Sequence, residues 1–106
     1  MITADETTFD SVVEQAEGLV LVYFWATWCG PCRVLGPTLE RIEADTEGAF
    51  TIVKVNADDC PQLAARYRVM AVPTMKLVVG GEVVRTIVGS KPRAALEAEL
   101  SPVLAG

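Results

Sequence analysis

The chain has 106 residues, which is enough for one hydrophobic core, and we expect a single domain over residues 1–106. A hydrophobic fraction of 51% with 22% charged residues excludes a disordered chain. The net charge of −5 and the lack of a basic run argue against nucleic acid or an anionic membrane as a partner.

The first residues predict a short strand followed by a helix. Ile2–Ala4 is expected to form an edge strand, and Met1–Glu6 lacks the positive start and apolar stretch of a signal peptide. The polar cluster Asp5–Thr8 is typical of a helix start, and Gly18 closes the helix. Its apolar residues recur at helical spacing: Phe9, Val12, Val13 and Ala16.

A buried strand leads into the most informative motif of the chain. Leu19–Ala26 is apolar without polar alternation, as in a parallel strand that is covered on both faces, and it is too short to span a bilayer. The motif Trp28-Cys29-Gly30-Pro31-Cys32 follows, and a helical pattern then runs to about Thr46, with Pro37 inside it. The two cysteines therefore lie where a strand ends and a helix begins.

The spacing of Cys29 and Cys32 predicts reversible dithiol/disulfide exchange. Residues three apart share one helix face, so the two sulfurs can form a disulfide. Cys29 is expected at the helix N-terminus, where free backbone N–H groups and the helix dipole favour a thiolate. We therefore expect Cys29 to be the attacking nucleophile, and Cys32 to resolve the mixed disulfide that Cys29 forms.

The second half of the chain predicts three more strands and two more helices. Strands are expected at Phe50–Asn56, Thr74–Val79 and Glu82–Val88, the last two joined by a hairpin at Gly80-Gly81. A short helix runs from Pro61 through Tyr67. Leu96, Leu100 and Val103 mark a last helix, with Pro92 in its first turn and Pro102 disturbing its end. Strands that first alternate with helices and end in a hairpin indicate an α/β fold with one antiparallel edge.

The remaining cysteine points to neither a metal site nor a disulfide framework. A zinc site needs four ligands; the chain has no His, and Cys60 alone does not complete a second pair. We expect Cys60, in a turn before Pro61, to be exposed and passive. Because two of the three cysteines form a redox pair, a reducing compartment, the cytoplasm, is expected.

Several further motifs resemble the thioredoxin family, in order and spacing, along essentially the whole chain. They are Phe24-Trp25-Ala26 before the Trp28–Cys32 motif, Pro37, Asn56-x-Asp58, Val72-Pro73-Thr74, Gly81-Glu82-Val83 and Val88-Gly89. The resemblance implies the thioredoxin fold, a five-stranded mixed β-sheet flanked by four helices. It also implies a cis Val72-Pro73 bond that faces the sulfurs, and a Trp25 indole N–H that meets Asp58.

The resemblance implies a protein-disulfide reductase. Its substrates would be disulfide-bearing proteins, which dock on Trp28, Val72, Pro73 and Gly89. The protein would be a monomer without a bound cofactor, and its electrons would come from NADPH through a separate flavin-containing thioredoxin reductase. In this family, Gly30-Pro31 between the cysteines is typical of the reducing members.

One position departs from the family pattern. Tyr23 stands where most thioredoxins carry a buried Asp that manages the proton of the residue matching Cys32, and Lys54 is left without that partner. Tyr23 and Lys54 are still expected to support the redox site, as are Gly30 and Pro31. Two alternatives remain open: a more oxidising disulfide oxidase or isomerase, and a thioredoxin-like binding module with weak redox activity, which Tyr23 favours.

Overall fold

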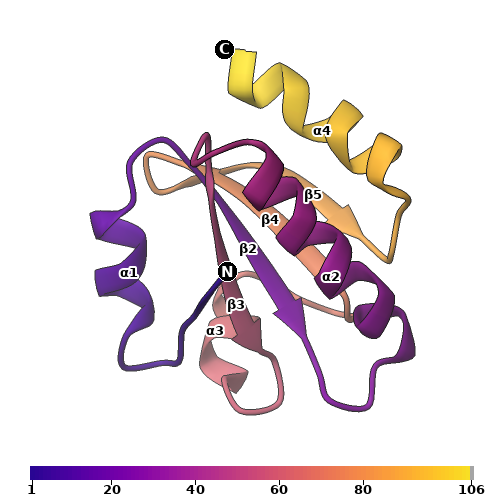
Figure 1. Cartoon of the computed structure of the whole chain (residues 1–106). Helices are drawn as coiled ribbons and strands as arrows, with labels where there is room; N and C mark the ends of the chain where they lie inside the picture. Colours follow the sequence, from indigo (N-terminus) through magenta and orange to yellow (C-terminus); the bar gives the residue numbers. More distant parts are fainter. Residues whose placement is uncertain (106) are drawn as a thin grey trace.

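The computed structural model describes residues 1–105, and its nine elements follow the expected order (Figure 1). The strands are β1 (Ile2–Thr3), β2 (Leu19–Trp25), β3 (Thr51–Asn56), β4 (Thr74–Val79) and β5 (Glu82–Val88). The helices are α1 (Phe9–Gln15), α2 (Gly30–Asp45), α3 (Pro61–Arg66) and α4 (Arg93–Ala105). This confirms the predicted α/β class.

The five strands form one mixed sheet in the order β1-β3-β2-β4-β5. β3 is parallel to both β1 and β2, whereas β4 is antiparallel to β2 and β5 is antiparallel to β4. The continuous apolar run of Leu19–Trp25 explains the central position of β2, because only a strand covered on both faces buries consecutive residues. Parallel pairing brings the carboxyl ends of β2 and β3 to the same edge, where Trp25 is opposite Asn56.

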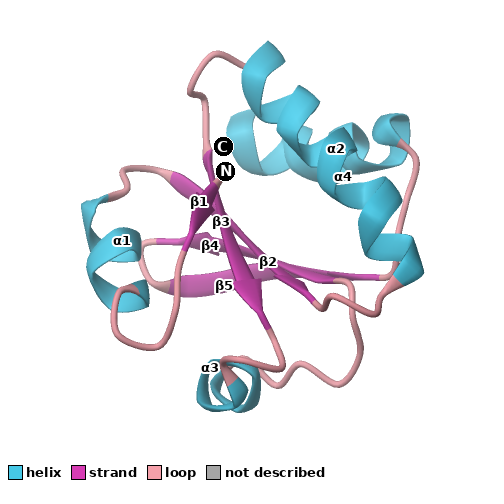
Figure 2. Cartoon of the chain, turned by 60° about the horizontal axis from the view of Figure 1, so that its bottom comes forward, coloured by secondary structure: helices cyan, strands magenta, loops and turns pink. Residues whose placement is uncertain are grey.

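Helices cover both faces of the sheet (Figure 2). Alternate residues of β2 point to opposite faces: Leu21 and Tyr23 join a core cluster with residues of α2 and α4, whereas Val22 and Phe24 join a cluster with residues of α1 and α3. The sheet therefore separates two cores, and Tyr23 belongs to the one beneath α2.

Two helices continue through a proline. α2 extends through Pro37, and α4 extends through Pro102 to Ala105, so the expectation that Pro102 disturbs the end of the last helix is wrong. Pro102 has no N–H, so the carbonyl of Ala98 receives no hydrogen bond from within the helix. Ala98 is exposed, and water can hydrate that carbonyl instead. Pro92 lies just before α4 and not in its first turn, although its carbonyl accepts the Leu96 N–H. Within residues 1–105, no helix has the length and apolar character needed to cross a membrane.

Candidate active site

Cys29 and Cys32 lie between the end of β2 and the first turn of α2. Cys29 is the N-cap residue of α2 and Cys32 is in its first turn, as the sequence predicts. The two residues are joined by a disulfide, and their Cα atoms are 5.3 Å apart. The strand-to-helix junction thus places the two sulfurs within bonding distance.

The sulfur of Cys29 also caps the helix. Its Sγ accepts a hydrogen bond of 3.2 Å from the backbone N–H of Cys32. Pro31 has no N–H, so the Cys32 amide is the next donor after Gly30 at this helix end. Both cysteines are nearly buried, with exposed fractions of 2% for Cys29 and 5% for Cys32. The two cysteines therefore do not differ in burial, but they differ in position, because only Cys29 is the N-cap residue of α2.

Trp28 extends into solvent beside the disulfide. It is 68% exposed, and its Nε1 donates a hydrogen bond of 2.7 Å to Oδ2 of Asp58. Asp58 sits in a turn after β3 that is held by the Asn56 side chain, whose Oδ1 accepts the backbone N–H of Asp58 at 2.9 Å. The expected partner of Asp58 was Trp25, and this expectation is wrong: Trp25 points into the core beneath α2, and its buried Nε1 has no hydrogen-bond partner there.

The residues expected to dock substrates lie close together. The Val72-Pro73 bond is cis, as expected, and the Pro73 carbonyl accepts a 2.9 Å hydrogen bond from the Gly89 N–H. Val72 packs against the core cluster that contains Cys29 and Cys32. Trp28 and Val72 also line one groove of about 390 Å³. Trp28, Val72, Pro73 and Gly89 therefore border the same side of the site.

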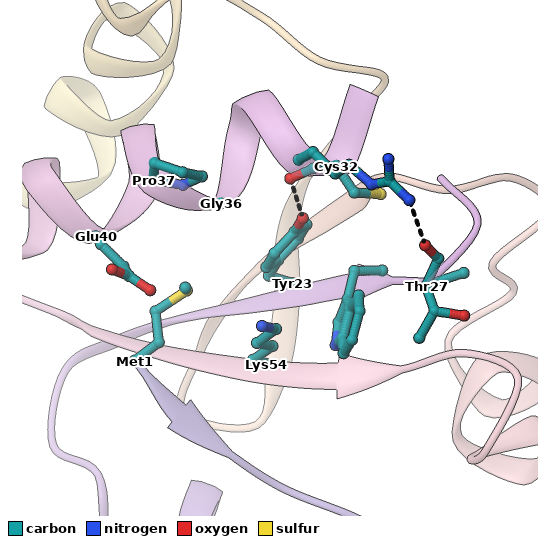
Figure 3. A pocket seen from close by; sticks show the side chains of 11 residues that line it. Met1, Tyr23, Thr27, Cys32, Gly36, Pro37, Glu40 and Lys54 are labelled. Carbon is teal, nitrogen blue, oxygen red and sulfur yellow. Dashed lines mark hydrogen bonds between the residues drawn. The ribbon is translucent and has the colours of Figure 1, made fainter. Parts of the chain in front are cut away.

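A second cavity, of about 350 Å³, lies beneath Cys32 (Figure 3). Tyr23 lines it, and its hydroxyl donates a 3.1 Å hydrogen bond to the backbone carbonyl of Cys32. Burial raises the pKa of Tyr23 to about 12. Lys54 lacks the family's Asp but has another partner, because its Nζ lies 4.2 Å from the centroid of the Trp25 ring.

Sequence reasoning missed one carboxylate at this cavity. Glu40 lines it together with Cys32 and Gly36 (Figure 3). These three residues are spaced by four along α2 and therefore share a helix face, which is the signal that could have identified Glu40.

Cys60 was expected to be exposed, and the structure corrects this. It is 2% exposed and joins the core cluster that contains Val53 and Val55, because α3 packs its start against the sheet. Burial raises the pKa of the Cys60 thiol, and the negative charge of Glu6 raises it further. Cys60 is the N-cap residue of α3, as Cys29 is of α2, but its side chain makes no capping hydrogen bond. The Cys60 thiolate thus lacks the helix-cap hydrogen bond that Cys29 accepts.

Comparisons with known proteins agree with the geometry. The family model described as Thioredoxin matches residues 1–102. The chain is 53% identical over 91 residues to the thioredoxin of Streptomyces clavuligerus, covering 86% of this chain and 84% of that protein. It is 45% identical over 92 residues to the thioredoxin of Listeria monocytogenes, with 87% of each chain covered.

The name of a longer relative includes both a thioredoxin reductase and a thioredoxin. The chain is 41% identical over 103 residues to the bifunctional thioredoxin reductase/thioredoxin of Mycobacterium leprae, which covers 97% of this chain but only 22% of that protein. The match therefore concerns one part of the longer polypeptide.

These findings agree on the chemistry of the site. The Cys29–Cys32 pair makes the protein a thiol–disulfide oxidoreductase that reduces protein disulfides by cycling between a dithiol and this disulfide. With a family model matched over residues 1–102 and relatives that are 45% and 53% identical over most of their length, the chain belongs to the thioredoxin family.

Proposed function

We propose that Cys29 is the attacking sulfur and Cys32 the resolving sulfur of the reductase. The Cys29 thiolate attacks one sulfur of a partner disulfide, forms a mixed disulfide and releases the other sulfur as a thiolate. Cys32 then loses its proton and attacks Cys29 Sγ, which forms the Cys29–Cys32 disulfide and releases the second partner thiolate. The partner disulfide gains the two electrons that the cysteine pair loses.

One observation carries this assignment: the 3.2 Å hydrogen bond from the Cys32 N–H to Cys29 Sγ at the start of α2. A backbone donor and the positive end of the helix dipole both stabilise negative charge on Cys29. Gly30 and Pro31 support the site by placing this amide in the helix turn that faces the sulfur. Cys32 lies inside the first turn of α2 and is not the N-cap residue.

Trp28, Val72, Pro73 and Gly89 form the proposed docking surface for substrates. Trp28 and Val72 line one apolar groove, and Pro73 offers no N–H of its own. An extended peptide segment laid along this groove would bring its disulfide to Cys29. Tyr23 and Lys54 act from the other side, where they line the cavity beneath Cys32.

The electron source is proposed to be NADPH, through a separate flavin-containing thioredoxin reductase. The Mycobacterium leprae relative, whose name joins a thioredoxin reductase to a thioredoxin, supports such a partnership. The protein would carry no cofactor of its own and act as a monomeric single domain, residues 1–106. Because two of its three cysteines form the redox pair, we place it in the reducing cytoplasm.

A two-stage assay tests the proposal. Reduction of a model protein disulfide is followed first with dithiothreitol as electron source, then with NADPH and thioredoxin reductase. Activity with both sources is expected, with Cys29→Ser inactive and the matched control Cys60→Ala active. Activity with dithiothreitol alone would refute the reductase partnership, and faster oxidation than reduction of the model protein would favour an oxidase.

A further inference from the structure

A third cavity lies away from the cysteines, where the end of α3 meets the hairpin of β4 and β5. Its volume is about 320 Å³, and it is lined by Arg66, Tyr67, Arg68, Lys76, Gly81 and Val83. Three of these six residues are cationic, in a chain whose net charge is −5. The redox chemistry of Cys29 and Cys32 uses none of them.

Lys76 is the first unusual feature of this cavity. It is 9% exposed and stands in β4 between Met75 and Leu77, which are both fully buried. Its Nζ donates a 3.1 Å hydrogen bond to Oγ1 of Thr86, and within residues 1–105 it has no carboxylate partner. A lysine side chain that is nine-tenths buried without a carboxylate partner gains less from its charge than one that is paired or fully hydrated.

Arg68 is the second unusual feature. It follows α3 with a φ of +57°, in the left-handed region that glycine adopts without strain and other residues rarely occupy. Its backbone N–H bonds the carbonyl of Ala65, so this conformation ends the helix. Glu47 has a similar φ of +50°, so the conformation alone assigns no role to Arg68. The Arg68 side chain is exposed and lines the cavity, where a ligand can reach it.

Charge balance shows what is missing from the cavity. Arg66 pairs with Asp10, whose Oδ1 is 2.8 Å from Nη1. The charge of Arg66 is therefore compensated by Asp10, and its position in the last turn of α3 is favourable for a cation. Lys76 and Arg68 have no such ion pair, so within the described part of the chain two cationic side chains line the cavity without a carboxylate partner.

We propose that this cavity binds the phosphate group of a small-molecule ligand. A phosphate monoester carries close to two negative charges at neutral pH, which matches the two uncompensated cations, whereas a carboxylate carries one. Guanidinium groups bind phosphate oxygens through paired N–H donors, and the Lys76 ammonium adds a point charge beneath them. The ligand would supply the negative charge that Lys76 and Arg68 lack among the described residues.

Calorimetric titration of the full chain with inorganic phosphate at low ionic strength tests the proposal. Saturable binding at one site per chain is expected. Lys76→Met and Arg68→Gly should each weaken it at least about tenfold, since each removes a charge-assisted contact. Arg41→Gln is the matched control, because it changes the net charge equally at an exposed helix position away from the cavity and should retain the wild-type affinity.

Arg68→Gly also separates binding from folding. Glycine tolerates the positive φ, so this variant should unfold at the same temperature as the wild type or higher while its phosphate affinity falls. Three results would overturn the proposal: no saturable binding to the wild type, unchanged affinity in both cavity variants, or an equal loss in Arg41→Gln. The last result would show that phosphate responds only to the overall charge.

Discussion

The Tyr23 hydroxyl donates a 3.1 Å hydrogen bond to the backbone carbonyl of Cys32, and so connects the central strand to the first turn of α2. The phenol is buried and has a pKa of about 12, so it is neutral at pH 7. Its proton is shared with a carbonyl and not with the Cys32 sulfur. Tyr23 therefore positions the helix that carries the cysteines, and it offers no carboxylate to take the Cys32 proton.

The raised pKa of Tyr23 predicts a loss of stability at high pH. An unfolded tyrosine ionises near pH 10, whereas the buried phenol keeps its proton until about pH 12. Stability is therefore fully present below about pH 10 and falls by roughly 2–3 kcal/mol as the pH rises to about 12. Urea unfolding at several pH values measures this loss.

Tyr23→Phe is the matched control for that measurement. At pH 7 it should cost about 1 kcal/mol, the usual net contribution of one hydrogen bond. Above pH 10 it should lose less stability than the wild type, since it has no phenol to ionise at this position. Burial also raises the pKa of Tyr67, but Tyr67 is present in both proteins. Parallel losses in the two proteins would contradict the assignment to Tyr23.

Tyr23→Asp is predicted to lower the stability of the protein and to accelerate the attack of Cys32 on the Cys29 mixed disulfide. The change removes a fully buried ring and introduces a carboxylate, at a cost of roughly 3–5 kcal/mol at pH 7. Lys54 is opposite residue 23 in the β2–β3 register and would offset part of that cost. The new carboxylate would accept the Cys32 proton, so decay of a Cys29 mixed disulfide should be faster near neutral pH.

Tyr23→Asn separates charge from cavity formation. Asparagine leaves a similar void but accepts no proton at neutral pH, so stopped-flow decay of the mixed disulfide should not accelerate. Thermal unfolding of both oxidised variants gives the stability difference that arises from the charge alone. If Tyr23→Asp is no faster than Tyr23→Asn at any pH, proton removal from Cys32 does not depend on a carboxylate at position 23.

The hydrogen bond between Trp28 and Asp58 predicts an effect on docking with little effect on stability. Asp58→Ala releases the indole N–H of an exposed ring, so the KM for protein substrates should rise several-fold while kcat changes less. Asp58→Asn keeps an acceptor oxygen and should lie between Asp58→Ala and the wild type. Thermal unfolding should shift little for either variant, because both partners are exposed. An unchanged KM in Asp58→Ala would argue that the orientation of Trp28 does not matter.

Cys60 is predicted to be unreactive in the folded protein. With the reduced chain, a thiol reagent such as Ellman's reagent should react quickly with two thiols and with the third only after unfolding. Cys60 is the slow thiol, because it is packed in the core with α3, its pKa is raised, and it lacks the cap hydrogen bond that Cys29 accepts. Cys60→Ala should leave the fast phase unchanged. Cys60→Ser should destabilise by roughly 1–3 kcal/mol, because it buries a hydroxyl group. Three equally fast thiols would contradict this, as would a disulfide-linked dimer that disappears in Cys60→Ala.

Local patterns in the sequence predicted most of the fold. The unbroken apolar run at Leu19–Ala26 identified β2 to within one residue, and Gly80-Gly81 located the hairpin of β4 and β5. The position of Cys29 as a helix cap also followed from local spacing. These features depend on residues that are close in sequence, where backbone preference and hydrophobic periodicity act directly.

Long-range packing decided the features that the sequence did not predict. Trp25 and Trp28 are only three residues apart, but β2 ends at Trp25. Trp25 therefore packs against the core, whereas Trp28 lies beyond the strand and donates its hydrogen bond to Asp58. Cys60 follows a polar turn, a local sign of exposure, but α3 buries it against the sheet. Lys76 occupies an apolar strand, and its cavity exists only because the end of α3 lies beside the hairpin.

The identity of the attacking sulfur is tested most directly by limiting alkylation. The fully reduced protein is treated with less than one equivalent of iodoacetamide at pH 7, and the adducts are mapped by peptide mass spectrometry. Because Cys29 has both the helix end and the Cys32 N–H to stabilise its thiolate, we predict that most of the label is on Cys29. Preferential labelling of Cys32 would contradict the assignment of nucleophile and resolver.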